Sequence, residues 1–321
     1  MPARSSRLPT MRRRTLGPVL ALAVLVVAFG LVHSTFFQAA NLSLVVEQSL
    51  VVGTLALGQA LVILTAGVDL ANAAVAVLGT LVVAKLAMTG TPGVVALLMG
   101  LLVAAAVAAV TGGLVTGLKL PPFIVTFGML VIVGAVVRLY AAGRTYSVTD
   151  GAVGWLGTTK YLFGRIELTY GMGLMLVMYL VAWFVLKRTR WGEDIKQIGA
   201  DPRAARRAGI RVRPTTLTVY VAAGVCYGVA AWQALGRVPI ADPEALPLGN
   251  LDSITAVVVG GVSLFGGRGS VLGTLAGALI VVVLRTGLAQ SGVDTLYQDI
   301  AVGVLMIAAV AVDRFSLGRQ R

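Results

Sequence analysis

Five charged side chains stand inside or at the edges of long apolar runs, where an ionised group is costly. They are Glu47, Asp69, Lys85, Arg138 and Arg285. A charged side chain at mid-bilayer costs roughly 2.5–3.5 kcal/mol on the insertion scale, so each one requires a partner, a wet cavity or a route to the interface. Glu47, Lys85 and Arg138 lie near predicted helix ends, from which a long side chain can reach water.

The other two charges have both a structural and a functional interpretation. Asp69 follows Gly67 at a predicted helix break, where it can cap the next helix or face a solute path. Arg285 can pair with Asp294 or Asp299, or line the path. Sugar and metabolite sites use hydroxyl, amide and carboxylate groups. Our candidates for a translocation path are therefore the polar residues beside breaks and kinks: Asp69, Asn72, Thr126, Ser263 and Arg285.

The residue types needed for enzyme chemistry are not gathered into a motif. No G-x-x-x-x-G-K-[ST] sequence occurs, so the chain lacks a phosphate loop of that kind. Its single histidine, His33, ends the first apolar run, and its single cysteine, Cys226, lies within a later one. Neither forms a metal-binding spacing. We expect no catalytic residue, no metal and no cofactor in this chain, and no enzyme activity of its own.

The polar stretch 187–215 separates two apolar runs and offers the largest surface to a soluble partner. Within it, an aspartate able to cap a helix precedes a proline, and a glycine follows the last alanine. A short helix with a smooth alanine strip beside arginines fits a cleft in a soluble protein, although a loop that binds anionic lipids is the alternative. The predicted docking helix comprises Asp201, Pro202, Ala204, Ala205, Arg206, Arg207, Ala208 and Gly209.

A membrane must position these groups. The 321 residues are 58% hydrophobic and 12% charged, with a mean hydropathy of +0.92. Repeated apolar runs of about 20 residues indicate transmembrane helices, and their continuity disfavours the alternating strands of a barrel. We predict an all-α polytopic membrane protein with about ten transmembrane helices. The segments are 16–32, 44–66, 70–88, 93–115, 123–141, 170–186, 216–236, 251–266, 269–290 and 293–312.

The net charge of +13 is unevenly distributed. Segments 4–14, 187–213 and 314–321 hold five, nine and three basic residues, which is 17 of the 26. The positive-inside rule puts all three in the cytoplasm, with both termini. No stacking platform for nucleic acid accompanies them. The first run follows three arginines and resembles a signal peptide, but its length favours an uncleaved span.

The predicted domain organisation follows from this topology. A cytoplasmic tail, a membrane domain and a second tail are expected at 1–15, 16–312 and 313–321. The membrane domain contains the cytoplasmic loop 187–215 and two outer loops, 142–169 and 237–250.

Glycine residues interrupt the predicted helices at two places. Breaks at 67–70 and 266–269 indicate helices that stop within the membrane, a device of transporters. They are compatible with an inverted repeat of spans 2–5 against spans 7–10, and equally with two unrelated breaks. Gly269, Gly273 and Gly277 recur every four residues, which predicts close helix packing on one face. That face lies either inside the monomer or at a subunit interface.

Four stretches, in this order, resemble the membrane permease subunits of bacterial ribose/xylose/galactose-type ABC sugar importers, the branched binding-protein-dependent transport permease family. The resemblance extends from about residue 40 to 312. Its motifs are 67–70, 118–128, 188–210 and 260–274.

The resemblance implies a permease that forms the translocation path for a pentose, hexose or related polyol in the bacterial cytoplasmic (inner) membrane, surrounded by lipid. Its implied partners are a second copy or a related permease, cytoplasmic ATPase subunits that hold ATP and Mg and dock near 201–210, and an extracytoplasmic sugar-binding protein. The missing phosphate loop agrees with energy supplied by another chain.

Four residues at three places depart from the family pattern. Ala71 stands where serine is usual, Thr111 where asparagine is usual, and Arg285-Thr286 where an asparagine pair is usual. The extra arginine suggests an anionic or otherwise unusual polyol as substrate. Two alternative functions are a self-sufficient secondary carrier of a small metabolite and a lipid-facing anchor that transports nothing.

Overall fold

The computed structural model describes residues 10–162 and 166–318. Residues 1–9 and 319–321, which belong to the two predicted tails, lie outside it, as do 163–165 of the first outer loop. Helices dominate the described residues, and the strands are short.

A helix occupies each of the ten predicted apolar segments. They are α1 (Thr10–Val32), α2 (Ala39–Leu64), α3 (Asn72–Met88), α4 (Gly93–Leu118), α5 (Pro122–Ala141), α7 (Tyr170–Arg188), α10 (Val212–Arg237), α11 (Gly249–Val259), α12 (Val271–Gln290) and α13 (Thr295–Gly318). Among the described residues, seven helices are long and apolar enough to span a membrane, while α3, α11 and the apolar part of α1 are shorter. The all-α membrane class is confirmed, and the count of about ten crossings stays a prediction.

Short elements connect these helices. They are η1 (Ser34–Phe37), β1 (Tyr146–Ser147), α6 (Gly151–Gly154), η2 (Trp155–Gly157), β2 (Thr159–Leu162), β3 (Ile166–Thr169), α8 (Arg190–Ala200), α9 (Pro202–Arg207) and β4 (Ile240–Ala241). Local signals set several boundaries. Pro122 opens α5, where its missing amide proton costs nothing, and the Ser270 side chain accepts from Gly273 N at the start of α12.

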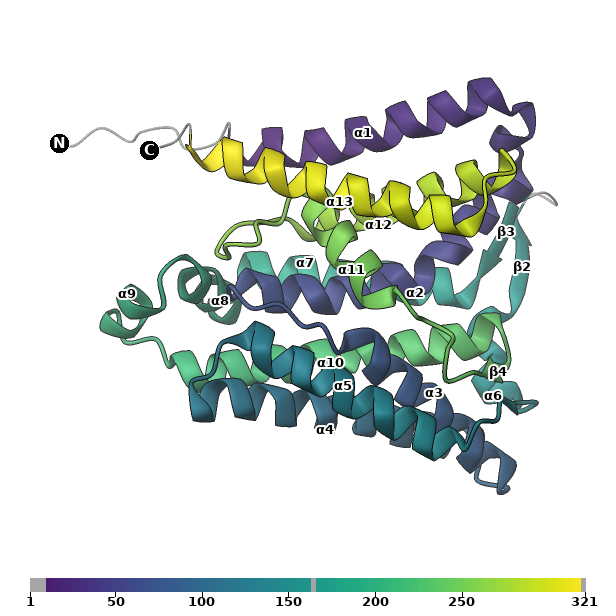
Figure 1. Ribbon diagram of the computed structural model, residues 1–321, viewed down its shortest axis with the longest axis horizontal. Helices are drawn as coiled ribbons and strands as arrows, with labels where there is room; N and C mark the ends of the chain where they lie inside the picture. Colours follow the sequence, from purple (N-terminus) through teal and green to yellow (C-terminus); the bar gives the residue numbers. More distant parts are fainter. Residues whose placement is uncertain (1–9, 163–165, 319–321) are drawn as a thin grey trace.

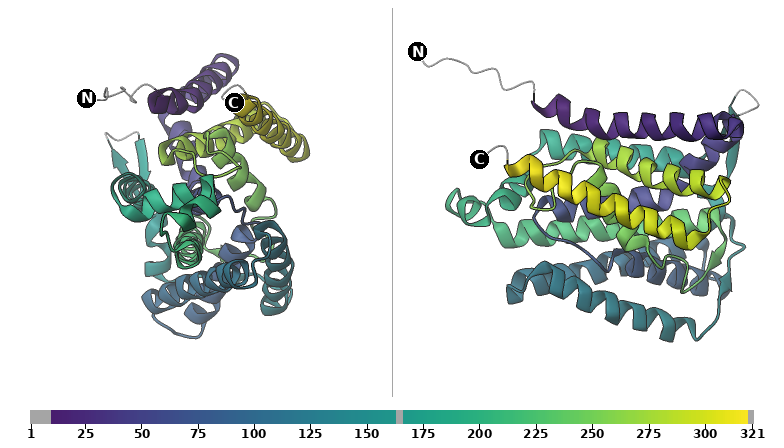
Figure 2. Two further views of the ribbon diagram at one scale, coloured as in Figure 1. Left: turned by 90° about the vertical axis from the view of Figure 1, so that its left-hand side faces the viewer. Right: turned by 45° about the horizontal axis from the view of Figure 1, so that its top comes forward.

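The long helices pack around a central pair, α2 and α10. Helices α3, α4 and α5 lie on one side of this pair, and α1, α12 and α13 lie on the other (Figures 1 and 2). Burial is greatest in α2, where 78% of the apolar window is buried, and least in α13, where 11% is buried. The core therefore sits between the two groups of helices, and α13 presents most of its surface outward.

The two ends of the bundle differ in what they carry. Helices α8 and α9 project from the end where α1 begins and α13 finishes (Figure 1). The short strands and α6 lie at the opposite end (Figure 1). There β1 pairs antiparallel with β4, with Tyr146 opposite Ala241, so the two predicted outer loops are joined. The basic clusters predict that the end carrying α8 and α9 is cytoplasmic, and that orientation stays a prediction.

Corresponding helices of the predicted repeat have corresponding neighbours. Helix α3 packs on α4, α5 and α10, just as α11 packs on α12, α13 and α2. The two helix breaks do not correspond, however, because one precedes α3 and the other follows α11. The glycine-marked breaks are thus separate features, and the inverted repeat stays a prediction that rests on packing.

Candidate functional site

The break between α2 and α3 holds a buried carboxylate. Asp69 is only 2% exposed. Its Oδ1 accepts from the amide of Ala71 at 2.9 Å, and its Oδ2 accepts from the Tyr227 hydroxyl of α10 at 3.1 Å. The capping interpretation is therefore close to the observed geometry, although the bond goes to the residue before the first turn of α3. Asp69 ties the break to α10.

Amide and hydroxyl side chains extend this network to α2 and α11. With its amide oriented so that donors meet acceptors, Gln59 donates to the Asp69 carbonyl oxygen at 2.9 Å and accepts from the Asp69 amide at 3.1 Å. Asn72 donates to the Ser253 hydroxyl at 2.7 Å, and Asn250 donates to the Leu70 carbonyl at 3.2 Å. Gln59 thus bonds the backbone amide and carbonyl of Asp69, which lie outside a helix and lack helical partners. The bonds of Asn72 and Asn250 hold α11 directly against the start of α3.

Thr126 of α5 joins the same region, because its hydroxyl donates to the Val68 carbonyl at 2.9 Å. The structure therefore brings together three of the five predicted path residues: Asp69, Asn72 and Thr126. All three are buried within the chain. We call this set, with Gln59, Tyr227 and Ser253, the break network. Its side chains hydrogen-bond to one another or to nearby backbone groups, and none of them lines either of the two cavities described below.

Arg285 lies elsewhere, in an ionic triad near the end of α12. Its guanidinium donates to Asp299 Oδ1 of α13 at 2.7 Å and to Asp252 Oδ1 of α11 at 2.8 Å. The predicted pairing with Asp299 is confirmed, whereas Asp294 instead accepts from the amide of Leu296. Two carboxylates balance the arginine, so this geometry does not support Arg285 as a site for an anionic substrate.

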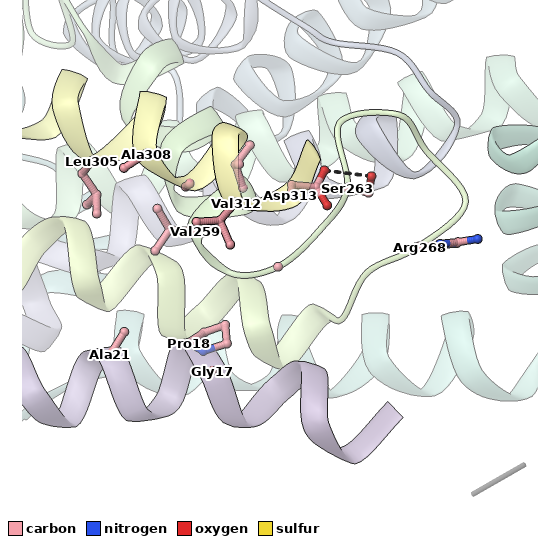
Figure 3. Close-up of a pocket in the computed structure, with 13 residues that line it drawn as sticks. Gly17, Pro18, Ala21, Val259, Ser263, Arg268, Leu305, Ala308, Val312 and Asp313 are labelled. Atoms are coloured by element: carbon pink, nitrogen blue, oxygen red, sulfur yellow. Dashed lines mark hydrogen bonds between the residues drawn. The ribbon is translucent and has the colours of Figure 1, made fainter. Parts of the chain in front are cut away.

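Ser263 lines a cavity of about 380 Å³ between α1, α13 and the loop 260–270. Its hydroxyl donates to Asp313 Oδ2 at 3.0 Å (Figure 3). The Arg268 side chain points away from this pair (Figure 3). The remaining walls are small or apolar side chains: Gly17, Pro18, Ala21, Val258, Val259, Gly261, Leu305, Ala308, Ala309 and Val312. The Ser263 hydroxyl therefore bonds to α13 and not to the break network.

A second cavity of about 430 Å³ lies between α4, α10 and the first outer loop. Trp155 and Trp232 line it, with ring centroids 6.3 Å apart, and the Trp232 indole donates to the Val153 carbonyl at 3.0 Å. The described residues of segment 142–169 thus pack against α10. Apart from the two indole nitrogens, the side chains that line this cavity offer no hydrogen-bonding group to a sugar hydroxyl.

The predicted docking helix is present as α9. The Asp201 side chain caps it by accepting from the amides of Arg203 and Ala204, Pro202 occupies its first turn, and Gly209 follows it with a φ of +84°. The hydrogen bonds from Ala204 and Arg203 hold the pKa of Asp201 below its ordinary value. Local signals alone therefore specify this helix.

One predicted member of the docking surface is misassigned. Ala205 is only 3% exposed and packs inside its own chain, because the α9 helix turns that position toward the rest of the loop. Ala204, Ala208 and their arginine neighbours are exposed. The surface available to a partner is therefore formed by Pro202, Arg203, Ala204, Arg206, Arg207, Ala208 and Gly209.

Helix α8, which carries α9, is anchored to the bundle. Trp191 donates to the Thr218 hydroxyl of α10 at 2.9 Å, and Lys196 Nζ donates to the Leu186 carbonyl of α7 at 2.6 Å. Burial of the ammonium group lowers the pKa of Lys196, and Glu193 partly opposes that shift. Ile195 and Ile198 are buried. Helix α8 thus connects α9 to α7 and α10.

The glycine row belongs to packing inside the chain. A Cβ on Gly273 would lie 2.1 Å from the Gly260 carbonyl oxygen, and one on Gly277 would lie 1.9 Å from that of Ala256. Both therefore seat α12 against α11. The prediction that all three glycines share a helix face is wrong for Gly269, because Ser270 caps α12 and Gly269 packs on Val262 before the helix begins.

Several residues of the site were not among the predicted ones. Gln59, Tyr227 and Ser253 complete the break network, and Asp252 completes the ionic triad. Gln59 could have been found as an amide inside an apolar run. Nothing in the order of the sequence indicates that Tyr227 lies beside Asp69, which is far from it along the chain.

Comparison with known proteins adds to this geometry. Residues 41–310 match the family described as the permease component of the branched-chain amino acid transport system. The chain is 38% identical to the fructose import permease protein of Rhizobium meliloti over 93% of its length and 84% of the relative's. It is 33% identical to the ribose import permease protein of Bacillus subtilis (strain 168), over 93% and 92% of the two chains.

A galactose/methyl galactoside import permease protein of Escherichia coli (strain K12) is 30% identical, with 95% of each chain covered. The matches run through the break network, the ionic triad and α9, so the resemblance is to whole proteins and not to a shared fragment. This chain therefore belongs to the family of membrane permease components of these transport systems.

Proposed function

We propose that this protein is the permease subunit of an ATP-driven ABC importer for a monosaccharide or related polyol, in the bacterial cytoplasmic membrane. The observation that carries the proposal is end-to-end similarity to import permeases for fructose, ribose and galactose. The relatives differ in their sugar, so their names support the class of substrate and not one member of it.

The chain has the features of a conduit that depends on a partner. It has no phosphate loop of the G-x-x-x-x-G-K-[ST] kind. At one end of the bundle, α9 carries an exposed basic surface on an anchored α8. We assign this surface to a cytoplasmic ATPase subunit that holds ATP and Mg. An extracytoplasmic sugar-binding protein would then dock at the opposite end, on the segments joined by β1 and β4.

Transport in proteoliposomes tests this proposal. Vesicles that contain the chain, its ATPase subunits and ATP should accumulate labelled sugar from the added binding protein, and vesicles without the ATPase should accumulate none. Uptake by the chain alone, driven by a proton or sodium gradient, would instead establish the secondary carrier. Failure of every arm, with correctly folded protein, would leave the anchor as the explanation.

A further inference from the structure

Three segments meet at the end of the bundle that carries α9. Leu64 is the last residue of α2, Gly199 lies in the last turn of α8, and Gly267 lies in the loop 260–270. The Gly267 amide donates to the Leu64 carbonyl oxygen at 3.0 Å. A Cβ on Gly199 would lie 1.9 Å from that oxygen and 2.5 Å from the Gly267 nitrogen. Helix α8 therefore rests directly on this hydrogen bond.

The adjacent residues make the contact continuous. Gly266 and Gly267 have φ values of +81° and +72°, which favour glycine. A Cβ on Gly266 would lie 2.7 Å from the Gly199 carbonyl oxygen and 2.7 Å from the Ala66 Cβ. We define Leu64, Ala66, Gly199, Gly266 and Gly267 as the glycine junction. Its segments touch backbone to backbone, with no flexible side chain between them.

The junction links the docking helix to both breaks in the membrane helices. One of its segments continues from Leu64 into the break that carries Asp69, which is held by the break network. A second segment, which carries Gly266 and Gly267, is the loop between α11 and α12. Helix α8 is fixed to α7 and α10 by Lys196 and Trp191. Close-packed backbone transmits displacement with little compression, so a shift of α8 must move both breaks.

We propose that Gly199 is a positioning residue for transport, through which movement of α8 and α9 reaches both helix breaks together. This inference rests on the proposed function, because it takes the driving force from an ATPase bound at α9. The junction sets how much transport each ATP yields and leaves ATP hydrolysis itself to the partner.

Substitution of Gly199 by alanine tests this role. Alanine favours the helix, so α8 should keep its conformation. The added methyl must move from 1.9 Å to at least 3.0 Å from the Leu64 oxygen, which separates α8 from α2. Gly113→Ala is the matched control, a helical glycine of α4 whose Cβ would meet nothing within 4 Å.

The readout is the number of sugar molecules imported per ATP hydrolysed by the complete complex in proteoliposomes. We expect Gly199→Ala to retain ATPase binding and hydrolysis but to lower this ratio by about tenfold, a coupling effect of usual size. Hydrogen exchange should report faster exchange of the Gly267 amide. Gly113→Ala should leave the ratio unchanged. A merely structural defect would lower transport and hydrolysis in parallel.

An unchanged ratio in the Gly199→Ala complex would overturn the inference while the proposed function stands. Absence of ATP-dependent uptake by the wild-type complex would refute the proposed function instead. If Gly199→Ala yields no folded complex, hydrogen exchange in the wild-type complex decides the matter. The Gly267 amide, which donates to the Leu64 carbonyl oxygen, should exchange at different rates with and without ATP. Equal rates in the two states would overturn the inference.

Discussion

The Asp69 carboxylate illustrates how a charged residue is retained in an apolar bundle. One of its oxygens is held by a backbone amide and the other by Tyr227, so both have partners. Tyr220 is also buried near this carboxylate, yet its hydroxyl has no hydrogen-bond partner among the described residues. Of these two tyrosines of α10, only Tyr227 contributes a hydrogen bond that stabilises the Asp69 carboxylate.

Tyr227→Phe should destabilise the protein by about 1–3 kcal/mol, because it leaves a buried carboxylate oxygen without its donor. Tyr220→Phe should be neutral or slightly stabilising, since it removes a buried hydroxyl that has no partner. Thermal unfolding of the two variants in detergent measures the difference. Equal losses of stability would show that the hydrogen bond to Asp69 is not what matters.

Arg285 should matter for stability and not for substrate choice. Arg285→Asn leaves Asp252 and Asp299 facing each other without their cation. We expect a loss of about 1–3 kcal/mol, less than for a fully buried ion pair because the three side chains are only partly buried, and an unchanged order of preference among sugars. Competition between sugars in the uptake assay measures that order. If the variant instead preferred neutral sugars more strongly than the wild type does, Arg285 would be a determinant of substrate selectivity.

Among the elements, α9 shows which parts of the fold the sequence can specify. Asp201, Pro202 and Gly209 act on backbone groups within a few residues, and the helix they predict is present. The inward direction of Ala205 depends on how α9 sits against α8 and α10, which local signals do not contain. Sequence separation has the same effect on the triad: Asp299, 14 residues from Arg285, was predicted as its partner, whereas Asp252, 33 residues away on α11, was not.

Two alanine positions of α9 should therefore respond differently to glutamate. Ala204→Glu adds a charge to an exposed surface, so the permease should fold normally but lose association with its ATPase. Ala205→Glu buries a carboxylate and should lower the unfolding temperature itself. Co-purification and thermal unfolding separate the two effects. Normal ATPase association of Ala204→Glu would remove that face from the docking surface.

The Asp201 cap predicts that the stability of the α9 helix depends on pH only in acid conditions. Its folded pKa is below its ordinary value, so its stabilising effect is complete above the ordinary carboxyl pKa of 3.8 and is lost as the pH falls through the lower folded value. Amide exchange in α9, corrected for its intrinsic pH dependence, should thus rise only in acid. Asp201→Ala should show fast exchange at every pH. Acid-sensitive exchange in that variant would assign the effect to another group.

At the scale of the whole molecule, the orientation in the membrane follows from which end carries α9. Cys226 is the only cysteine and is buried, so replacing it by serine supplies a background for labelling. A membrane-impermeant maleimide should label Ser147→Cys in intact cells and Ala208→Cys only after permeabilisation. The reverse pattern would place α9 outside the cell and refute the ATPase assignment.

The pairing of β1 with β4 has a consequence for where a solute can cross. This pair fastens the two outer segments to each other, and a Cβ on Gly157 would lie 1.7 Å from the Gly236 carbonyl oxygen, so η2 is pressed on α10 as well. The glycine junction joins segments by backbone contact at the opposite end, so one copy is closed at both ends of its helix bundle. A sugar would then pass along the outer face of one copy, and a second permease copy would form the other side of the path.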